Sequence, residues 1–295
     1  TGVGCVGVGQ EALGANTTAS YNSALGYNAL RTTTTGANNT GLGKDALYYN
    51  TTGYENTAVG SNAMLANTDG YRSTAVGYGA LDANTTGDNH VAIGYNALGA
   101  NTTGGDNVAV GYAALGANTT GNNLVAMGTN ALDANTTGTY NVGIGQHALG
   151  ANTTGHSNVA VGIDTLDANT TGYENVAVGR SALGSVTDGF ENTAVGQNAG
   201  GGITTGDNNT FLGNAAGQAT TTADVNTAVG NAALASNTTG VSNTAVGKGA
   251  ADAATTANHM VAIGFGALKA QTTGQYNVGI GAGSAGGALT TGDGH

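Results

Sequence analysis

The stretch that decides the fold runs from residue 94 to residue 111 and reads GYNALGANTTGGDNVAVG. Its final glycine recurs every 17 residues from Gly9 to Gly281 without a slip, and the unit follows the pattern x-x-A-L-x-A-N-T-T-G-x-x-N-V/T-A-V/I-G. A chain of 295 residues would ordinarily suggest two or three domains, but a repeat of this regularity overrides that expectation. The sequence therefore predicts a single repeat domain over residues 1–295, uncapped at both ends.

Each repeat is predicted to form one coil of a solenoid. Residues 107–111 alternate β-branched with small residues, which is typical of a strand, whereas 17 residues are too few for a helical repeat of about 33. A second short extended piece is expected from Ala97-Leu98, and the following N-T-T-G favours a turn. Coils stacked in register predict an all-β fold, a parallel β-solenoid or β-roll of about 17 coils and on the order of 80 Å long.

Composition excludes several classes of protein. The net charge is −11, with six Lys and Arg, so no basic surface is available to neutralise phosphates and no nucleic-acid partner is expected. No apolar run approaches the roughly 18 residues of a membrane span, and membrane insertion is not expected. The chain contains no proline, which fits a stacked ladder because proline would remove a backbone N–H from it.

Two apolar columns are predicted to form a thin continuous core along the stack. One is the residue before each repeat glycine, as in Val59, Val76, Ile93 and Val110. The other is the leucine column of the A-L pair, as in Leu98. Each coil alone would bury too little apolar surface, so neighbouring coils must complete the core.

The residue between the two valines of each strand is almost always alanine or glycine. Because side chains alternate along a strand, this column should face away from the valines and out of the core. An unbroken stripe of small side chains suggests the close approach of another backbone, and we predict a subunit interface there. Its central members are Ala92, Ala109, Ala126, Gly143, Ala160 and Ala177.

The first threonine of N-T-T-G is present in sixteen successive repeats, from Thr17 to Thr272. We interpret it as a structural threonine ladder that stabilises the turn. An ice-binding face is the alternative, but the two adjacent threonines would point in opposite directions on an extended strand. The central members of the ladder are Thr85, Thr102, Thr119, Thr136, Thr153 and Thr170.

Candidate chemical sites are few. Cys5 occupies the column of the asparagine before the strand, so it is interpreted as a repeat residue, with an intermolecular cross-link as the alternative. The histidines fall at different positions of the coil, and no facing metal-ligand set is evident. Residues 2–7 match G-x-G-x-x-G without the strand, helix and acidic residue that a dinucleotide site needs. We expect no catalytic residue, no cofactor and no metal.

The strand motif resembles a known family. Asn107-Val108-Ala109-Val110-Gly111 and residues 90–94 are similar to the head repeats of trimeric autotransporter adhesins of the YadA type. The longer unit resembles repeats of bacterial and phage tail-fibre-like proteins. The resemblance implies a homotrimeric, left-handed parallel β-roll on a cell or virion surface, acting as an adhesive or spacer rod.

We therefore expect a non-catalytic extracellular rod or fibre, either an adhesin head or a tail-fibre shaft. One alternative is the subunit of a filament stacked end to end, and another is an ice- or carbohydrate-binding solenoid that uses the Thr and Asn ladders. The expected partners are copies of this chain and a host receptor or glycan. The N-T-T tripeptides are glycosylation sequons, but glycans about 4.8 Å apart would collide, which favours a bacterial or phage origin.

Overall fold

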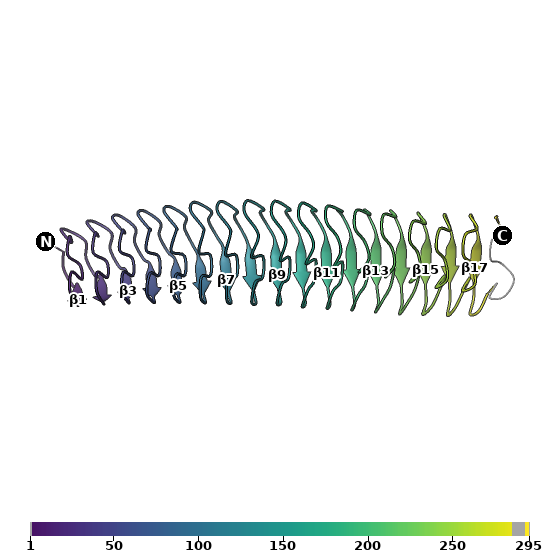
Figure 1. The fold of residues 1–295 in the computed structure, drawn as a ribbon, viewed down its shortest axis with the longest axis horizontal. Helices are drawn as coiled ribbons and strands as arrows, with labels where there is room; N and C mark the ends of the chain where they lie inside the picture. The colour runs from purple at the N-terminus through teal and green to yellow at the C-terminus, as the bar shows by residue number, and fades with distance from the viewer. Residues whose placement is uncertain (1, 285–292, 295) are drawn as a thin grey trace. The chain divides into compact units, whose positions relative to one another are not determined.

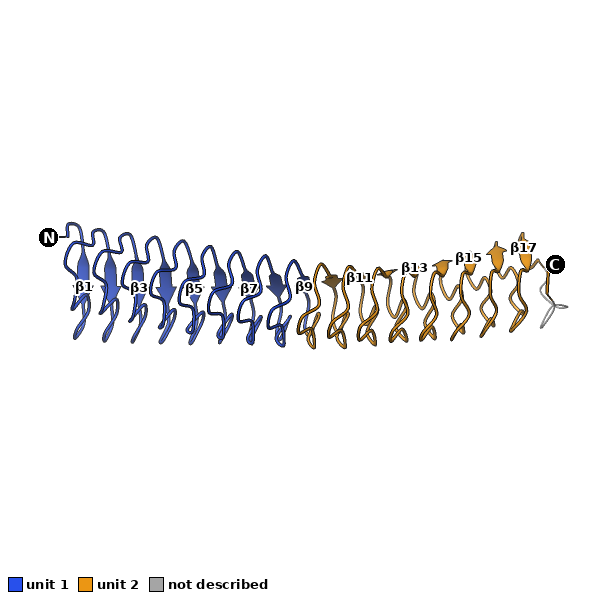
Figure 2. Ribbon diagram, turned by 90° about the horizontal axis from the view of Figure 1, so that it is seen from above, with its two compact units in different colours: residues 1–146 blue, residues 147–295 orange. Residues whose placement is uncertain are grey.

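The computed structural model describes residues 2–284 and 293–294. These residues form two compact units, one over residues 1–146 and one over residues 147–295, coloured separately in Figure 2. The chain ends, for which the sequence predicts uncapped coils, include residues 1, 285–292 and 295, which lie outside the described residues.

Along the described residues, the coils each contribute one short strand (Figure 1), three residues long. The strands of the first unit are β1 (Val6–Val8), β2 (Ser23–Leu25), β3 (Thr40–Leu42), β4 (Thr57–Val59), β5 (Thr74–Val76), β6 (Val91–Ile93), β7 (Val108–Val110), β8 (Val125–Met127) and β9 (Val142–Ile144). The strands of the second unit are β10 (Val159–Val161), β11 (Val176–Val178), β12 (Thr193–Val195), β13 (Thr210–Leu212), β14 (Thr227–Val229), β15 (Thr244–Val246), β16 (Val261–Ile263) and β17 (Val278–Ile280).

The predicted fold class is confirmed: within each unit the strands pair in parallel, each with the next along the chain, from β1 to β9 and from β10 to β17, at an offset of one repeat. In the pair β6–β7, for example, Val91 lies opposite Val108 and Ala92 opposite Ala109. The ladder continues beyond the strands, because the N–H of Gly111 donates to the carbonyl of Ile93 at 2.8 Å. Because the backbone N–H groups of most of the coil donate to a neighbouring coil, a proline would remove one of these hydrogen bonds, which explains why the sequence has none.

The interior of the coil corrects the predicted core. Leu98 and the leucine column are buried as predicted, but the side chains that face them are the small middle residues of the strands. Val108 and Val110 point outward and are partly exposed, and Ile93 is 40% exposed, so the Val/Ile column is not core. The predicted interface stripe is likewise wrong, because its residues lie at 0% exposure or in the buried class inside the coil: Ala92, Ala109, Ala126, Gly143, Ala160 and Ala177.

The physical reason is the thickness of the coil. The leucine lies directly over the middle of the strand, so that a Cβ on Gly41 would be 3.3 Å from Cγ of Leu30 and a Cβ on Gly279 would be 2.6 Å from Cγ of Leu268. Only alanine or glycine fits at the middle position opposite a leucine. The middle residues of the strands are therefore small because the leucines inside the coil leave no room for larger side chains, and no outside contact is needed to explain their size.

The sequence also predicts an extended segment at the leucine, and this prediction is wrong. Leu98 has a φ of 53° and lies in a turn, and the other buried leucines of this column adopt similar left-handed values. A left-handed leucine carries steric strain of about 1–2 kcal/mol. The buried leucine side chain and the coil-to-coil hydrogen bonds offset this strain, as when the N–H of Leu98 donates to the carbonyl of Ala114 at 3.0 Å.

Candidate functional site

The outward face of the strands is the most unusual surface of the molecule. The first residue of each described strand is Val, Thr or Ser, the third is Val, Leu, Ile or Met, and no strand contains a charged residue. Leu25 is 51% exposed and Val278 is 55% exposed. Parallel sheets are normally covered on both faces, so an uncovered parallel sheet with an apolar surface is a candidate interaction site.

In the first unit this face contains a shallow apolar groove. A cavity of about 250 Å³ lies over β1, β2 and β3, and its lining side chains include Val6, Val8, Leu25 and Leu42. Each of these four side chains is 40% or more exposed. The groove is open to solvent and its lining is largely apolar.

Aromatic side chains stack from coil to coil beside the strands. Tyr78, Tyr95 and Tyr112 directly follow repeat glycines, and their rings stack nearly parallel at centroid distances of 5.5 and 5.2 Å. Because the ring faces cover one another, the stack offers mainly ring edges to solvent. A carbohydrate that stacks on an aromatic face would find the inner ring of this stack occupied on both sides.

The threonine hydroxyls form a hydrogen-bonded ladder along the stack. Oγ1 of Thr85 donates to the carbonyl of Thr102 at 3.0 Å, and Oγ1 of Thr102 donates to the carbonyl of Thr119 at 3.0 Å. The bonds from Thr119, Thr153 and Thr170 repeat this geometry, and Thr136 accepts the bond from Thr119. These hydroxyl hydrogens bind the next coil and are not offered to a ligand.

Two asparagine ladders fill the polar part of the coil interior. In the first, Nδ2 of Asn101 donates to Oδ1 of Asn84 at 2.9 Å and to the carbonyl of Gly104 at 3.0 Å. In the second, Oδ1 of Asn107 accepts from the N–H of Leu124 at 3.0 Å. The amides are completely buried and satisfy backbone groups that the short strands leave unpaired, so their role is structural.

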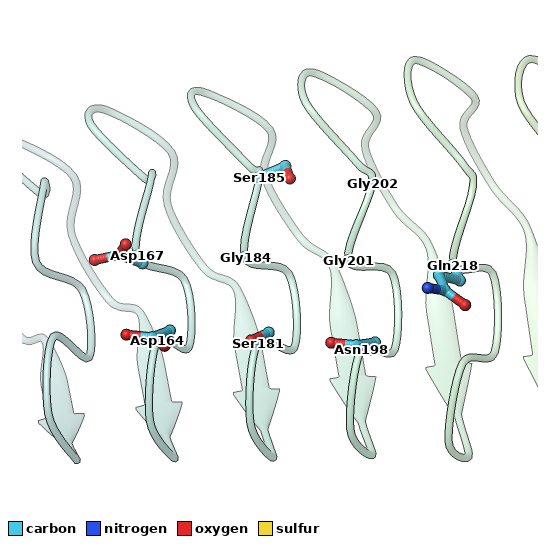
Figure 3. Close-up of a pocket in the computed structure, with 9 residues that line it drawn as sticks. All are labelled: Asp164, Asp167, Ser181, Gly184, Ser185, Asn198, Gly201, Gly202 and Gln218. Carbon is cyan, nitrogen blue, oxygen red and sulfur yellow. The ribbon is translucent and has the colours of Figure 1, made fainter.

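A polar trench crosses four coils of the second unit (Figure 3). It has a volume of about 430 Å³, and its floor is open because Gly184 and Gly201 stand where other coils carry longer side chains, such as Asp167. One end carries two carboxylates, and burial together with the charge of Asp164 raises the pKa of Asp167. Nδ1 of His147 lies 3.4 Å from Oδ1 of Asp164. The trench offers hydroxyl, amide and carboxylate groups without a nucleophile–base pair.

Nothing in the described part of the chain assembles a metal centre, since no group of three or more His, Cys, Asp or Glu side chains could hold an ion there. Cys5 is partly exposed in the first coil, and its Sγ lies 3.4 Å from the carbonyl of Ala19. It is the single cysteine among these 295 residues, so they form no disulfide among themselves, and an intermolecular cross-link is the alternative that the sequence leaves. That cross-link stays a prediction.

Comparison with known proteins returns no match, either among protein-family models, among curated proteins or among solved structures. Within residues 2–284 and 293–294, no helix has the length and apolar character of a membrane span.

Two features of the site were missed by sequence reasoning. The outward apolar face could have been found from size: alanine or glycine at nearly every strand centre, opposite a column that is mostly leucine, indicates a thin interior. The trench has no distinctive signal, because the successive glycines at residues 184 and 201 lie in a variable column that also has glycine at residues 99 and 116.

Proposed function

We propose that this protein is a non-catalytic structural element that associates with copies of itself through the outward strand face to build an extracellular rod or fibre. The observation that carries the proposal is the uncharged apolar face of an otherwise uncovered parallel sheet. Burying this face would stabilise an oligomer by roughly 25 cal/mol per Å² of apolar surface removed from water. The partner is a second copy, because it repeats its side chains at the same spacing.

The distribution of charge supports self-association. The chain has a net charge of −11, yet its acidic side chains lie on the turns and leave the strands free of charge. Copies that meet at the strands keep their carboxylates in solvent and avoid close like-charge contact. The acidic turns also keep the assembled fibre soluble.

The biological setting follows from the resemblance of the repeat to YadA-type adhesin heads and tail-fibre-like proteins. We assign the chain to the surface of a bacterial cell or a phage particle, as an adhesin head or a fibre shaft, with a homotrimer as the expected assembly. A filament of unlimited length is the rival assembly. Receptor or glycan binding would take place on the turns, which carry the variable residues.

The test is the molar mass of the purified protein, measured by light scattering over a hundredfold range of concentration, together with negative-stain images. A fixed multiple of 28.4 kDa is expected for a closed oligomer, whereas a mass that grows with concentration identifies a filament. A protein that stays monomeric over the whole range overturns the proposal.

A pair of matched variants locates the contact. Val178→Lys with Val229→Lys places two charges on the strand face three coils apart, and Thr171→Lys with Thr222→Lys places two charges on exposed turn positions at the same separation. The strand variant is expected to be monomeric and folded by circular dichroism. The turn variant is expected to keep the wild-type mass. Equal masses for the two variants would move the contact away from the strands.

A further inference from the structure

The first residues of the strands are arranged in blocks. In the second unit this outward position reads Val, Val, Thr, Thr, Thr, Thr, Val, Val from β10 to β17. The block members are Thr193, Thr210, Thr227 and Thr244. The first unit has its own block of hydroxyl side chains, Ser23, Thr40, Thr57 and Thr74, with Val6 on one side and Val91 on the other. The third position of the strands is always aliphatic and shows no comparable blocks.

The hydroxyls of the block are available for a partner. Within the described residues, none of the four threonines Thr193–Thr244 uses its side chain in a hydrogen bond. This contrasts with the threonine ladder of the N-T-T-G turns, in which Oγ1 of Thr204 donates to the carbonyl of Thr221. The strand threonines are partly exposed, so water satisfies them in the isolated chain.

We propose that these hydroxyl blocks set the register in which copies of this chain pack together, with the Thr193–Thr244 block of one copy against the same block of its neighbour. The inference rests on the proposed self-association through the strand face. When the face is covered, a threonine opposite a valine loses its water without gaining a partner, which is costly. A threonine opposite a threonine can exchange a hydrogen bond instead.

The block pattern disfavours slipped arrangements. A slip of one coil leaves one threonine opposite a valine at each end of the block. A slip of four coils, about 19 Å at the usual strand spacing, leaves all four threonines of each copy without a threonine opposite. Valine and threonine have almost the same shape, so the blocks discriminate by hydrogen bonding and leave steric packing nearly unchanged.

The pattern in the second unit reads the same from either end. A parallel arrangement in register and a two-fold antiparallel arrangement about the centre of the block both bring threonine to threonine. In the parallel arrangement residue 210 faces residue 210, whereas in the antiparallel arrangement residue 210 faces residue 227. Both arrangements satisfy the register rule. Residue 159 faces residue 159 in the parallel arrangement and residue 278 in the antiparallel one, so cross-linking of Val159→Cys with itself or with Val278→Cys distinguishes them.

The experiment uses the full chain with Cys5→Asn, which restores the common residue of that column, and single cysteines on the strand face. Facing sheets lie about 10 Å apart, so a short bismaleimide is a suitable cross-linker. The variants are Thr210→Cys, Thr227→Cys, Val159→Cys and Val278→Cys. They are reacted alone and as mixtures in which one member carries an affinity tag, so that products between different variants are resolved by mass.

The expected result is rapid cross-linking of Thr210→Cys with itself, or of Thr210→Cys with Thr227→Cys, and at least tenfold less product from Val159→Cys mixed with Thr227→Cys. These last two sites are four coils apart. Replacement of the whole block by valine should keep the oligomer and raise the slipped product to the level of the others. Similar yields from all mixtures in the wild-type block overturn the register rule while leaving self-association intact. A monomeric mass for the same samples overturns both.

Discussion

The phenyl ring of Phe211 occupies the space that a side chain on Gly217 would need, since a Cβ built on Gly217 would lie 2.5 Å from Cζ of Phe211. A side chain on Gly200 would meet the same ring, because a Cβ built there would lie 2.9 Å from Cδ2 of Phe211. All the remaining described strands have alanine or glycine at the middle position, where β13 has Phe211. Residues 200 and 217 lie in the column that is leucine in most coils. The ring of Phe211 thus fills the interior space that two leucines would otherwise occupy.

This exchange predicts the behaviour of Phe211→Ala. The substitution leaves a cavity between two coils that both lack a leucine, and it should lower the free energy of unfolding by about 3–5 kcal/mol. Gly217 has a φ of 60° and Leu98 has a φ of 53°, so residue 217 can accept a leucine. Urea unfolding followed by circular dichroism should therefore find the double variant Phe211→Ala with Gly217→Leu more stable than Phe211→Ala. Equal stabilities of the single and double variants would contradict the idea that Phe211 takes the place of the missing leucine.

A second prediction concerns the asparagine ladder of the N-T-T-G turns. Asn118 donates through Nδ2 to Oδ1 of Asn101 at 2.9 Å, so Asn118→Val leaves that buried oxygen without a donor. The cost should be about 1–3 kcal/mol in urea unfolding. The control is Val186→Asn, at the equivalent position where the ladder already ends and Oδ1 of Asn169 has no partner. The control should stay within about 1 kcal/mol of wild type, because it moves the unpartnered oxygen by one coil.

A loss in the control as large as that in Asn118→Val would show that the ladder position tolerates only the residue it holds. No loss in Asn118→Val would show that the amide ladder contributes nothing to stability.

The coil length, the position of the strand and the buried leucine could all be predicted from the sequence, because the repeat aligns equivalent residues one above another. Which face of the strand is inside could not be predicted from alternation, since a period of two allows both choices. The volume of the facing residue decides it: Leu30 leaves room only for a small residue at Gly41. The aliphatic residues were assigned to the core on hydrophobicity alone, and that assignment was wrong.

The left-handed leucine is the feature furthest from local sequence preference. Nothing in the propensity of Leu98 indicates a φ of 53°. A turn at this place folds the chain back over the strand and points the side chain at the alanine column, and neighbouring coils hold it there through hydrogen bonds. The left-handed conformation is stabilised by contacts between neighbouring coils, so it cannot be predicted from the sequence of one repeat.

The repeat glycine provides a third prediction. Gly111 has a φ of 144°, and its Cβ position lies 2.4 Å from the carbonyl oxygen of Gly128, so Gly111→Ala must strain the backbone and push two coils apart. The free energy of unfolding should fall by more than about 2 kcal/mol. Gly116→Ala is the matched control, because its Cβ would meet the carbonyl oxygen of Ala113 at 3.1 Å and its φ is not left-handed. Chemical unfolding should place this control within about 1 kcal/mol of wild type; equal effects would contradict the assigned role of the repeat glycine.

The last prediction concerns His90, which replaces a buried asparagine of the second ladder. Its Nδ1 accepts from the N–H of Asn107 at 3.4 Å, and its Nε2 lies 3.3 Å from Nδ2 of Asn101. Burial lowers the pKa of His90 to about 4, although the nearby carboxylates of Asp88 and Asp106 act in the opposite direction. The folded protein therefore holds a neutral imidazole whose Nδ1 must stay unprotonated.

Because the folded pKa of about 4 lies below the unfolded value of 6.5, the unfolded chain takes up the proton first as the pH falls. The stability associated with neutral His90 is complete above pH 6.5 and declines between pH 6.5 and pH 4, by about 3 kcal/mol in all. His90→Asn restores the common residue of the column and should remove this part of the pH dependence. Urea unfolding of both proteins at pH 7.5 and pH 4.5 isolates the effect, since the carboxylates titrate alike in each. Parallel losses of stability in the two proteins would contradict it.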